Sequence, residues 1–279
     1  MKKILVPTDF SGNSKAGVRF AMLLAERQKL ELVFIHVVNI LRASRWSDAY
    51  YESYARQEEE IHRQKLETYI GSIYSELSIS PGKRSFVVLN GLSPDISLLD
   101  YSRNARGIDL ICISTRGAGK LKKIFGTNTG NLITRSEVPV LAVPRNYKGT
   151  GISRILYASD LMNYASELKK VIAIAEIFEA AIDVVHFAWP EEIMPERKKV
   201  EALSRKPFKY GLNLHFEEDD GMQSFIDNLE KQVSKRKPGM LVMFTNQQRT
   251  FFQKLFSGSR AEQVAFRIKV PLLVFNKAK

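Results

Sequence analysis

Residues 2–11 read KKILVPTDFS, and residues 153–162 read SRILYASDLM. Each is a short apolar run that ends in a small hydroxyl residue followed by aspartate, and Asp160 minus Asp9 is 151. Two further pairs of runs recur in the same order, namely LELVFIHVV (30–38) with AAIDVVHFAW (180–189), and SEVPVLAVP (136–144) with IKVPLLVFN (268–276). A repeat with so long a period indicates a duplicated domain. We therefore expect two similar domains, 1–147 and 148–279.

Apolar runs in the first copy predict the strands of a sheet. They are nearly continuous in Val, Ile, Leu and Phe, as in strands that are covered on both faces. The runs are 3–7, 31–38, 85–89, 108–114 and 138–143. Helical periodicity between them calls for a parallel sheet flanked by helices. The predicted fold class is α/β, with two doubly wound domains that each have a five-stranded parallel sheet.

Several helices are also predicted. Ala16, Phe20, Leu23 and Leu24 share one helical face, and Ile96, Leu98 and Leu99 begin another. Residues 46–78 form a long, charged segment that reads as a mostly solvated helix. Candidate N-caps are Ser11, Asn13 and Ser14 before the first helix and Ser93, followed by Pro94, before the third.

Composition and charge exclude some classes of protein. The single Cys112, within an apolar run, excludes an internal disulfide and a cysteine-based zinc site, and it reads as a buried strand residue. The net charge of +12 is compatible with a polyanionic partner, but no aromatic residues interleave with the cations as a nucleic-acid platform requires. No stretch is long and apolar enough for a membrane span or a secretory leader. We expect a soluble cytoplasmic protein.

Residues 114–129, STRGAGKLKKIFGTNT, are the richest candidate for binding chemistry. The segment follows a strand, contains three glycines and leads into a helix, so its amides are suited to phosphate. A β-to-α loop whose glycines only serve turns is the alternative. The segment does not match GxxxxGK[ST], and no GxGxxG follows the first strand.

Taken together, VPTDFS (6–11), IHVV (35–38), GLSPD (91–95) and the SxxG at 114–117 with GT at 126–127 resemble the universal stress protein family. The resemblance covers both halves. It implies a five-stranded parallel α/β fold, and in the ATP-binding members a GxxG, nine residues, then G[ST]. Here Ser114 replaces the first glycine, and eight residues separate Gly117 from Gly126.

The resemblance implies an ATP site, with Mg²⁺ as an option, in the first half. Asp9 with its neighbours would border adenine and ribose, and the Val37 backbone would meet adenine. The loop after the fourth strand would hold the phosphates. The expected contact residues are Pro7, Thr8, Asp9, Val37, Ser114, Arg116, Gly117, Gly126, Thr127, Asn128 and Thr129. Asp9 can alternatively be a helix-capping carboxylate.

The second half departs from this pattern. Asp160, Gly258 and Ser259 remain, but Gly117 aligns with the stretch 247–249, and two phenylalanines follow at 251–252. We expect this half to bind nucleotide poorly or not at all and to act as a scaffold and partner surface. His36 and His186 recur at equivalent strand positions and are interpreted as structural, because neither half offers a companion ligand at metal spacing.

Three functions compete. The leading one is a non-enzymatic, ATP-binding stress or regulatory protein, and the others are an interaction module that has lost nucleotide and a slow ATPase. The sequence offers no pair of nucleophile and base for the third. Family dimers join through the last strand, so the halves are expected to form an internal pseudo-dimer through 138–143 and 270–275. A homodimer of the tandem chain and the identity of its protein partners are left open.

Overall fold

The protein consists of two compact units, Met1–Asn146 and Tyr147–Lys279. The structure is a computed structural model. It describes residues 1–115, 127–149, 151–189, 193, 197–198, 200–201, 208–218, 225–245 and 269–276, without the side chains of residues 127, 128, 226 and 245. Each unit is described by itself below.

The first unit contains a parallel sheet of five strands. These are β1 (Lys3–Pro7), β2 (Glu31–Val38), β3 (Arg84–Asn90), β4 (Leu110–Thr115) and β5 (Val140–Pro144). Their order is β3-β2-β1-β4-β5, and Leu5 at the centre of β1 pairs with Val33 of β2 and Ile111 of β4. Ile4, Leu5 and Val6 have no exposed surface, which agrees with a sheet covered on both faces.

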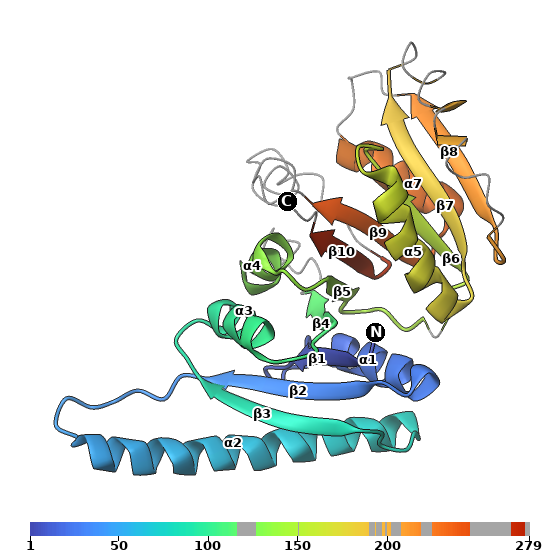
Figure 1. The fold of residues 1–279 in the computed structure, drawn as a ribbon. Helices are drawn as coiled ribbons and strands as arrows, with labels where there is room; N and C mark the ends of the chain where they lie inside the picture. Colours follow the sequence, from blue (N-terminus) through green and yellow to red (C-terminus); the bar gives the residue numbers. More distant parts are fainter. Residues whose placement is uncertain are drawn as a thin grey trace. The chain divides into compact units, whose positions relative to one another are not determined.

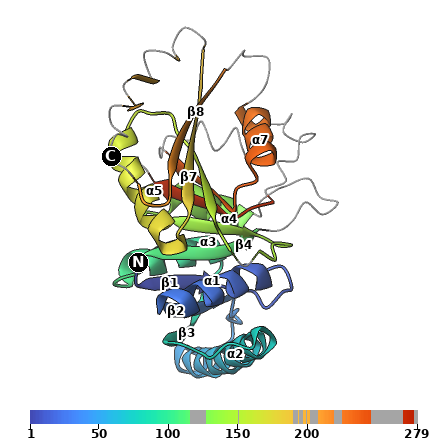
Figure 2. The same cartoon turned by 90° about the vertical axis from the view of Figure 1, so that its right-hand side faces the viewer.

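Four helices cover this sheet, as Figures 1 and 2 show. They are α1 (Lys15–Gln28), α2 (Asp48–Leu77), α3 (Pro94–Asn104) and α4 (Thr127–Arg135). The chain runs outward from β1 through β2 to β3 and then crosses back to β4. Because such crossovers are right-handed, α1 and α2 lie on one face, and α3 and α4 lie on the other. Within each pair the helices contact one another.

The second unit repeats this arrangement. Its strands are β6 (Arg154–Ala158), β7 (Ala181–Ala188), β8 (Leu212–Glu218), β9 (Met240–Thr245) and β10 (Leu272–Asn276), in the order β10-β9-β6-β7-β8. Helices α5 (Tyr164–Phe178) and α7 (Phe225–Arg236) correspond to α1 and α3. The central strand β6 pairs with β7 and β9, as β1 pairs with β2 and β4. The predicted fold class and duplication are confirmed.

Most predicted elements of the first unit are confirmed to within two residues. The solvated helix is α2, in which buried residues occur only from Leu66 onward. Cys112 is fully buried, and burial raises the pKa of its thiol. Ile96 is wrong as a core residue, because it is 49% exposed while Leu98 and Leu99 are buried. Pairing of the two units through their last strands stays a prediction.

In the part of the chain that the structure describes, no helix is long and apolar enough to cross a membrane. In the same residues, no group of three or more His, Cys, Asp or Glu side chains is arranged to hold a metal ion.

Candidate functional site

The candidate site lies in the first unit at the carboxyl ends of β1 and β4. The chain leaves β1 toward β2 on one side and returns to β4 on the other, so strand order reverses between these two strands. Ligands of open parallel sheets bind beyond the carboxyl ends of the strands at such a switch point. Thr8 and Asp9 follow β1, and Ser114 lies one residue before the end of β4. The fold therefore brings the predicted residues of both segments to one edge.

Hydrogen bonds fix the turn between β1 and α1. The Thr8 amide donates to the Ile35 carbonyl (3.0 Å), and the Phe10 amide donates to Thr8 Oγ1 (3.1 Å). Thr8 Oγ1 also lies 2.8 Å from Ser14 Oγ. Phe10 itself has a left-handed backbone, with φ of 61°. Thr8 is buried and its hydroxyl makes both of these contacts, so Thr8 holds the turn in place. The side chain of Asp9 beside it is exposed.

Asp9 presents a negative charge at this edge. Its Oδ1 accepts hydrogen bonds from the Ser11 amide (3.0 Å) and the Ser11 hydroxyl (2.6 Å). Partial burial acts to raise the pKa of Asp9, but these hydrogen bonds from Ser11 outweigh it and hold the pKa below its usual value. Both bonds are made within the turn before α1 rather than to the helix itself.

Ser114 has a structural task. Its Oγ accepts a hydrogen bond from the Gly17 amide (2.6 Å) and donates one to the Ser14 carbonyl (2.8 Å). Ser14 is the N-cap residue of α1, but its side chain makes no capping bond. The amide of Gly17, three residues after the cap, is the usual target of an N-cap side chain. Ser114 on β4 therefore performs the capping that Ser14 does not.

Aromatic residues gather around His36, which precedes Val37, the residue predicted to contact adenine through its backbone. The Phe10 ring packs on His36 with ring centroids 4.2 Å apart, and His62 of α2 stacks on His36 at 5.1 Å. His36 Nδ1 lies 2.9 Å from the Thr8 carbonyl, and burial lowers the pKa of His36. His186 makes the same contact with Ser159 in the second unit (2.8 Å). These backbone contacts agree with a structural interpretation of both histidines.

A polar contact joins α3 to α4. Asp95 is buried, and its two oxygens accept from the Ser93 hydroxyl (2.5 Å) and from Asn131 Nδ2 (2.6 Å). Burial acts to raise the pKa of Asp95, but these two bonds prevail and lower it. Ser93 therefore binds Asp95 instead of capping α3 with its side chain. The contact ties the first turn of α3 to α4, the helix that follows the predicted phosphate segment.

Sequence reasoning did not find this Asp95–Asn131 contact. Asp95 was quoted only as part of the GLSPD motif, and Asn131 carried no pattern of its own. An aspartate in the first turn of a helix predicts favourable helix electrostatics, but not a partner on another helix. No local signal pairs residues that are 36 positions apart.

Some of the other residues predicted to contact the nucleotide lie outside the part of the chain that the structure describes. Arg116, Gly117 and Gly126 fall outside the described residues. Thr127 begins α4 and Asn128 follows it, but their side chains are not described. Thr129 is buried in the first turn of α4. Pro7 is the last residue of β1, and Val37 lies in β2 paired with Leu89.

The same edge of the second unit contains large side chains. Phe244 is the fifth residue of β9, as Ser114 is of β4, and its ring stacks on Phe275 with centroids 4.9 Å apart. The buried Tyr157 ring lies 5.6 Å from Phe244. Counting back from the C-caps Lys29 and Glu179, Glu167 occupies the position of Gly17, and it accepts from the Tyr157 hydroxyl. Large side chains therefore occupy this edge in the second unit, whereas in the first unit the Gly17 backbone lies directly against Ser114.

Comparison with known proteins identifies the family. The model of the universal stress protein family matches residues 1–144. The chain belongs to this family. A crystal structure of a universal stress protein from Archaeoglobus fulgidus matches with a TM-score of 0.65 and 19% identity, covering 99% of this chain and 97% of that one. A putative universal stress protein from Pseudomonas aeruginosa matches with a TM-score of 0.63 and 16% identity, over 99% and 93%.

These two structural matches extend over both units, and at this identity they show the fold. A search of curated proteins finds no match to this chain. For this universal stress protein, the ligand therefore has to be argued from the site itself.

Proposed function

We propose that this universal stress protein binds one adenine nucleotide in its first unit and acts as a non-enzymatic stress or regulatory protein. The observation that carries the proposal is the convergence of Asp9 and the end of β4 at the switch point of the sheet. Switch points of open α/β sheets are the usual ligand sites of such folds. ATP, alone or with Mg²⁺, is the proposed ligand.

The described residues have chemistry that fits a nucleotide. Helix α4 begins at Thr127, directly after Gly126, and the N-terminus of a helix attracts phosphate through its free amides. Asp9 keeps its negative charge at neutral pH and can accept hydrogen bonds from ribose hydroxyls. The rings of Phe10 and His36 provide an aromatic border at the end of β1, and the Val37 backbone is proposed to contact the base. Bound ATP would supply the negative charge that Arg116 and α4 are proposed to hold.

The proposal assigns no reaction to the site. Asp9 is the only carboxylate among the predicted contacts, and its lowered pKa makes it a weak general base. Ser114 is an unsuitable nucleophile because its hydroxyl proton is donated to the Ser14 carbonyl. Bound nucleotide is proposed instead to shift a conformational equilibrium of the protein or to stabilise its fold by mass action.

In this proposal the second unit does not bind nucleotide. Phe244 and Phe275 stack at its carboxyl edge, and the Lys170 ammonium lies 6.0 Å and 5.9 Å from their ring centroids. A phosphate group there would meet aromatic rings in place of open backbone. The unit is proposed to serve as scaffold and as the surface for protein partners.

Isothermal titration calorimetry with matched variants tests this function. MgATP is titrated into the wild type, into Gly126→Glu, and into Gly258→Glu at the equivalent position of the second unit. We expect one site in the wild type, loss of binding in Gly126→Glu because a carboxylate would repel phosphate, and unchanged binding in Gly258→Glu. Equal binding by all three proteins would contradict the proposed site.

Two outcomes would support the competing functions. An absence of heat and of thermal shift with ATP, ADP and AMP would favour an interaction module without nucleotide. Multiple-turnover release of phosphate that disappears in Asp9→Ala would favour an ATPase.

A further inference from the structure

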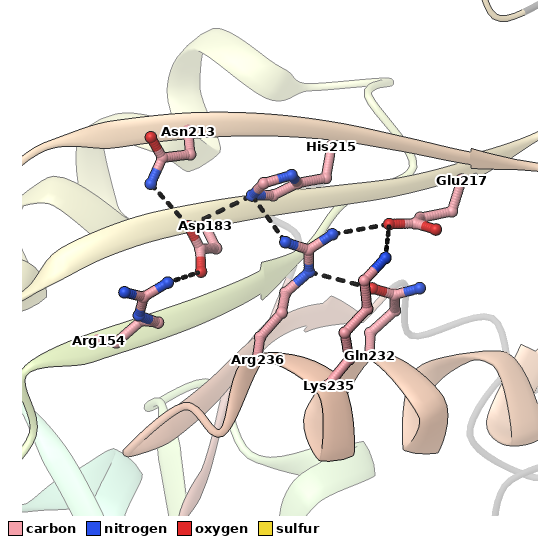
Figure 3. Close-up of polar contacts among 8 residues, drawn as sticks. All are labelled: Arg154, Asp183, Asn213, His215, Glu217, Gln232, Lys235 and Arg236. Carbon is pink, nitrogen blue, oxygen red and sulfur yellow. Dashed lines mark hydrogen bonds and ion pairs between the residues drawn. The ribbon is translucent and has the colours of Figure 1, made fainter.

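A charge network surrounds one buried carboxylate within the second unit, and Figure 3 shows its eight residues on β6, β7, β8 and α7. At its centre is Asp183 of β7, whose side chain is 1% exposed. Its Oδ2 accepts from Arg154 Nη1 (3.0 Å), and its Oδ1 accepts from Asn213 Nδ2 (2.8 Å). Burial acts to raise the pKa of Asp183, but the bonds from Asn213, His215 and Arg154 prevail and lower it. Asp183 is therefore a buried carboxylate that stays charged.

His215 of β8 connects this carboxylate to α7. Its Nε2 lies 3.3 Å from Asp183 Oδ1 and 3.0 Å from Arg236 Nη1. Arg236 also donates from Nη2 to Glu217 Oε1 (2.7 Å) and from Nε to Gln232 Oε1 (3.0 Å). The same imidazole nitrogen therefore faces an obligatory acceptor on one side and an obligatory donor on the other (Figure 3).

These two contacts of Nε2 exclude one another. A guanidinium can only donate, so Arg236 bonds to His215 when Nε2 is unprotonated and offers its lone pair. A carboxylate can only accept, so Asp183 bonds to His215 when Nε2 carries a proton. In a protonated imidazole both nitrogens are donors, and its charge also repels the guanidinium. One proton thus decides which of the two bonds exists.

We propose that His215 is a proton-operated switch that couples α7 to the sheet of the second unit. Neutral His215 accepts from Arg236 and holds α7 against β8. Protonated His215 donates to Asp183 on the neighbouring strand and releases Arg236 Nη1. Because histidine is the side chain whose charge ordinarily changes between about pH 5 and 8, the switch is tested across that range.

Among the described residues, each charged group that contacts His215 or its two partners acts in a defined direction. Asp183 on β7 favours the protonated ring, and Arg236 on α7 favours the neutral one. Glu217 on β8 neutralises Arg236 at 2.7 Å and lies 3.7 Å from Lys235 Nζ of α7. Arg154 on β6 is engaged with Asp183 and shields part of its charge. Because Glu217 and Gln232 keep their bonds to Arg236 in both states, α7 is loosened rather than detached.

The first unit has no counterpart of this switch. Counting along matched strands, Val33 of β2 takes the place of Asp183, and Val87 and Leu89 of β3 take the places of His215 and Glu217. These first-unit residues are apolar, so the duplicated sheet acquired its charged side chains in one copy only. The inference is independent of nucleotide binding, and it gives the second unit a response of its own.

The ring nitrogens of His215 provide the most direct test. In ¹⁵N NMR spectra of the full chain at pH 7.5, we expect His215 to be neutral with its proton on Nδ1 and Nε2 accepting. Near pH 5.5 both nitrogens should be protonated. A ring that carries its proton on Nε2 at pH 7.5 would overturn the proposal, because Arg236 could not then donate to it.

Hydrogen exchange measures the consequence for α7. Relative to α5 in the same unit, amide protection in α7 should fall about tenfold between pH 7.5 and pH 5.5 after correction for intrinsic rates, as expected for losing one hydrogen bond. His215→Gln should abolish this pH dependence, because an amide can accept from Arg236 and donate to Asp183 at once. His186→Gln, which removes the other histidine of β7 and β8, should retain it. Protection of α7 that follows α5 at both pH values, or a pH response that persists in His215→Gln, would overturn the proposal.

Discussion

Ser114 caps α1 from a neighbouring strand. The resemblance to ATP-binding family members predicted a ligand contact at this position, where their pattern has glycine. The structure gives the hydroxyl two partners in the first turn of α1, Gly17 at 2.6 Å and Ser14 at 2.8 Å. The side chain that interrupts the family pattern therefore stabilises the scaffold next to the proposed site.

Replacing Ser114 tests this role. Ser114→Ala should lower the free energy of unfolding by about 1 to 2 kcal/mol, because the Gly17 amide loses its cap. The affinity for MgATP should stay within about threefold of the wild type, since the hydroxyl is already engaged. Urea denaturation and calorimetry on the same preparation measure both quantities. An affinity that falls tenfold or more with unchanged stability would instead make Ser114 a ligand contact.

Asp183 gives the second unit a defined acid sensitivity. Its folded-state pKa lies below the usual value near 3.8, so its bonds stabilise the unit above that pH and are lost as the pH falls through the folded-state pKa. Asp183→Asn should cost about 2 kcal/mol at pH 7 and should flatten the loss of stability between about pH 4 and 2. Urea unfolding at each pH, followed by Trp189 fluorescence in a Trp46→Phe background, measures these free energies of unfolding. If the free energy of unfolding fell in parallel with pH in the wild type and in Asp183→Asn, Asp183 would not be the source of this acid sensitivity.

At the scale of elements, α1 approaches β4 closely at Gly17. A Cβ at this position would lie 2.7 Å from the Ser114 nitrogen and 2.9 Å from the Ile113 carbonyl carbon, both of which are backbone atoms. Glycine within a helix normally costs stability relative to alanine. Gly17 is present because the helix could not otherwise lie so close to the strand.

Two matched glycine substitutions separate packing from helix propensity. Gly17→Ala should destabilise the protein by about 1 to 3 kcal/mol through overpacking. Gly71→Ala in α2, where nothing lies within 4 Å of the added Cβ, should stabilise it by up to about 1 kcal/mol. Urea denaturation followed by circular dichroism gives both values. A stabilising Gly17→Ala would show that α1 is free to move away from β4.

Elements with a strong local pattern were predictable from sequence. The strands have continuous apolar runs, and the 46–78 segment has a helical pattern with charged faces, so their type and approximate bounds followed directly. The prediction for Ile96 failed because residues two positions apart lie on nearly opposite sides of a helix, so Ile96 cannot share the buried face of Leu98. The Ser114 cap, the Asp95–Asn131 contact and the bonds of Asp183 could not be predicted, since each joins residues at least 29 positions apart.

At the scale of the whole chain, duplication has given two units with one strand order and different chemistry. The first combines Asp9 with an open backbone approach at its switch point, while the second has Phe244 and Tyr157 there. The second instead carries Asp183, His215 and Glu217 where the first has the apolar residues Val33, Val87 and Leu89. We infer that the two units have different functions, in which the first unit binds nucleotide and the second responds to protons.

The stoichiometry of nucleotide binding tests this division most directly. Native mass spectrometry of the full chain in excess MgATP should show one bound nucleotide per chain for the wild type and for Gly258→Glu, and none for Gly126→Glu. Two bound nucleotides, or one that survives Gly126→Glu but not Gly258→Glu, would contradict the assignment of the site to the first unit.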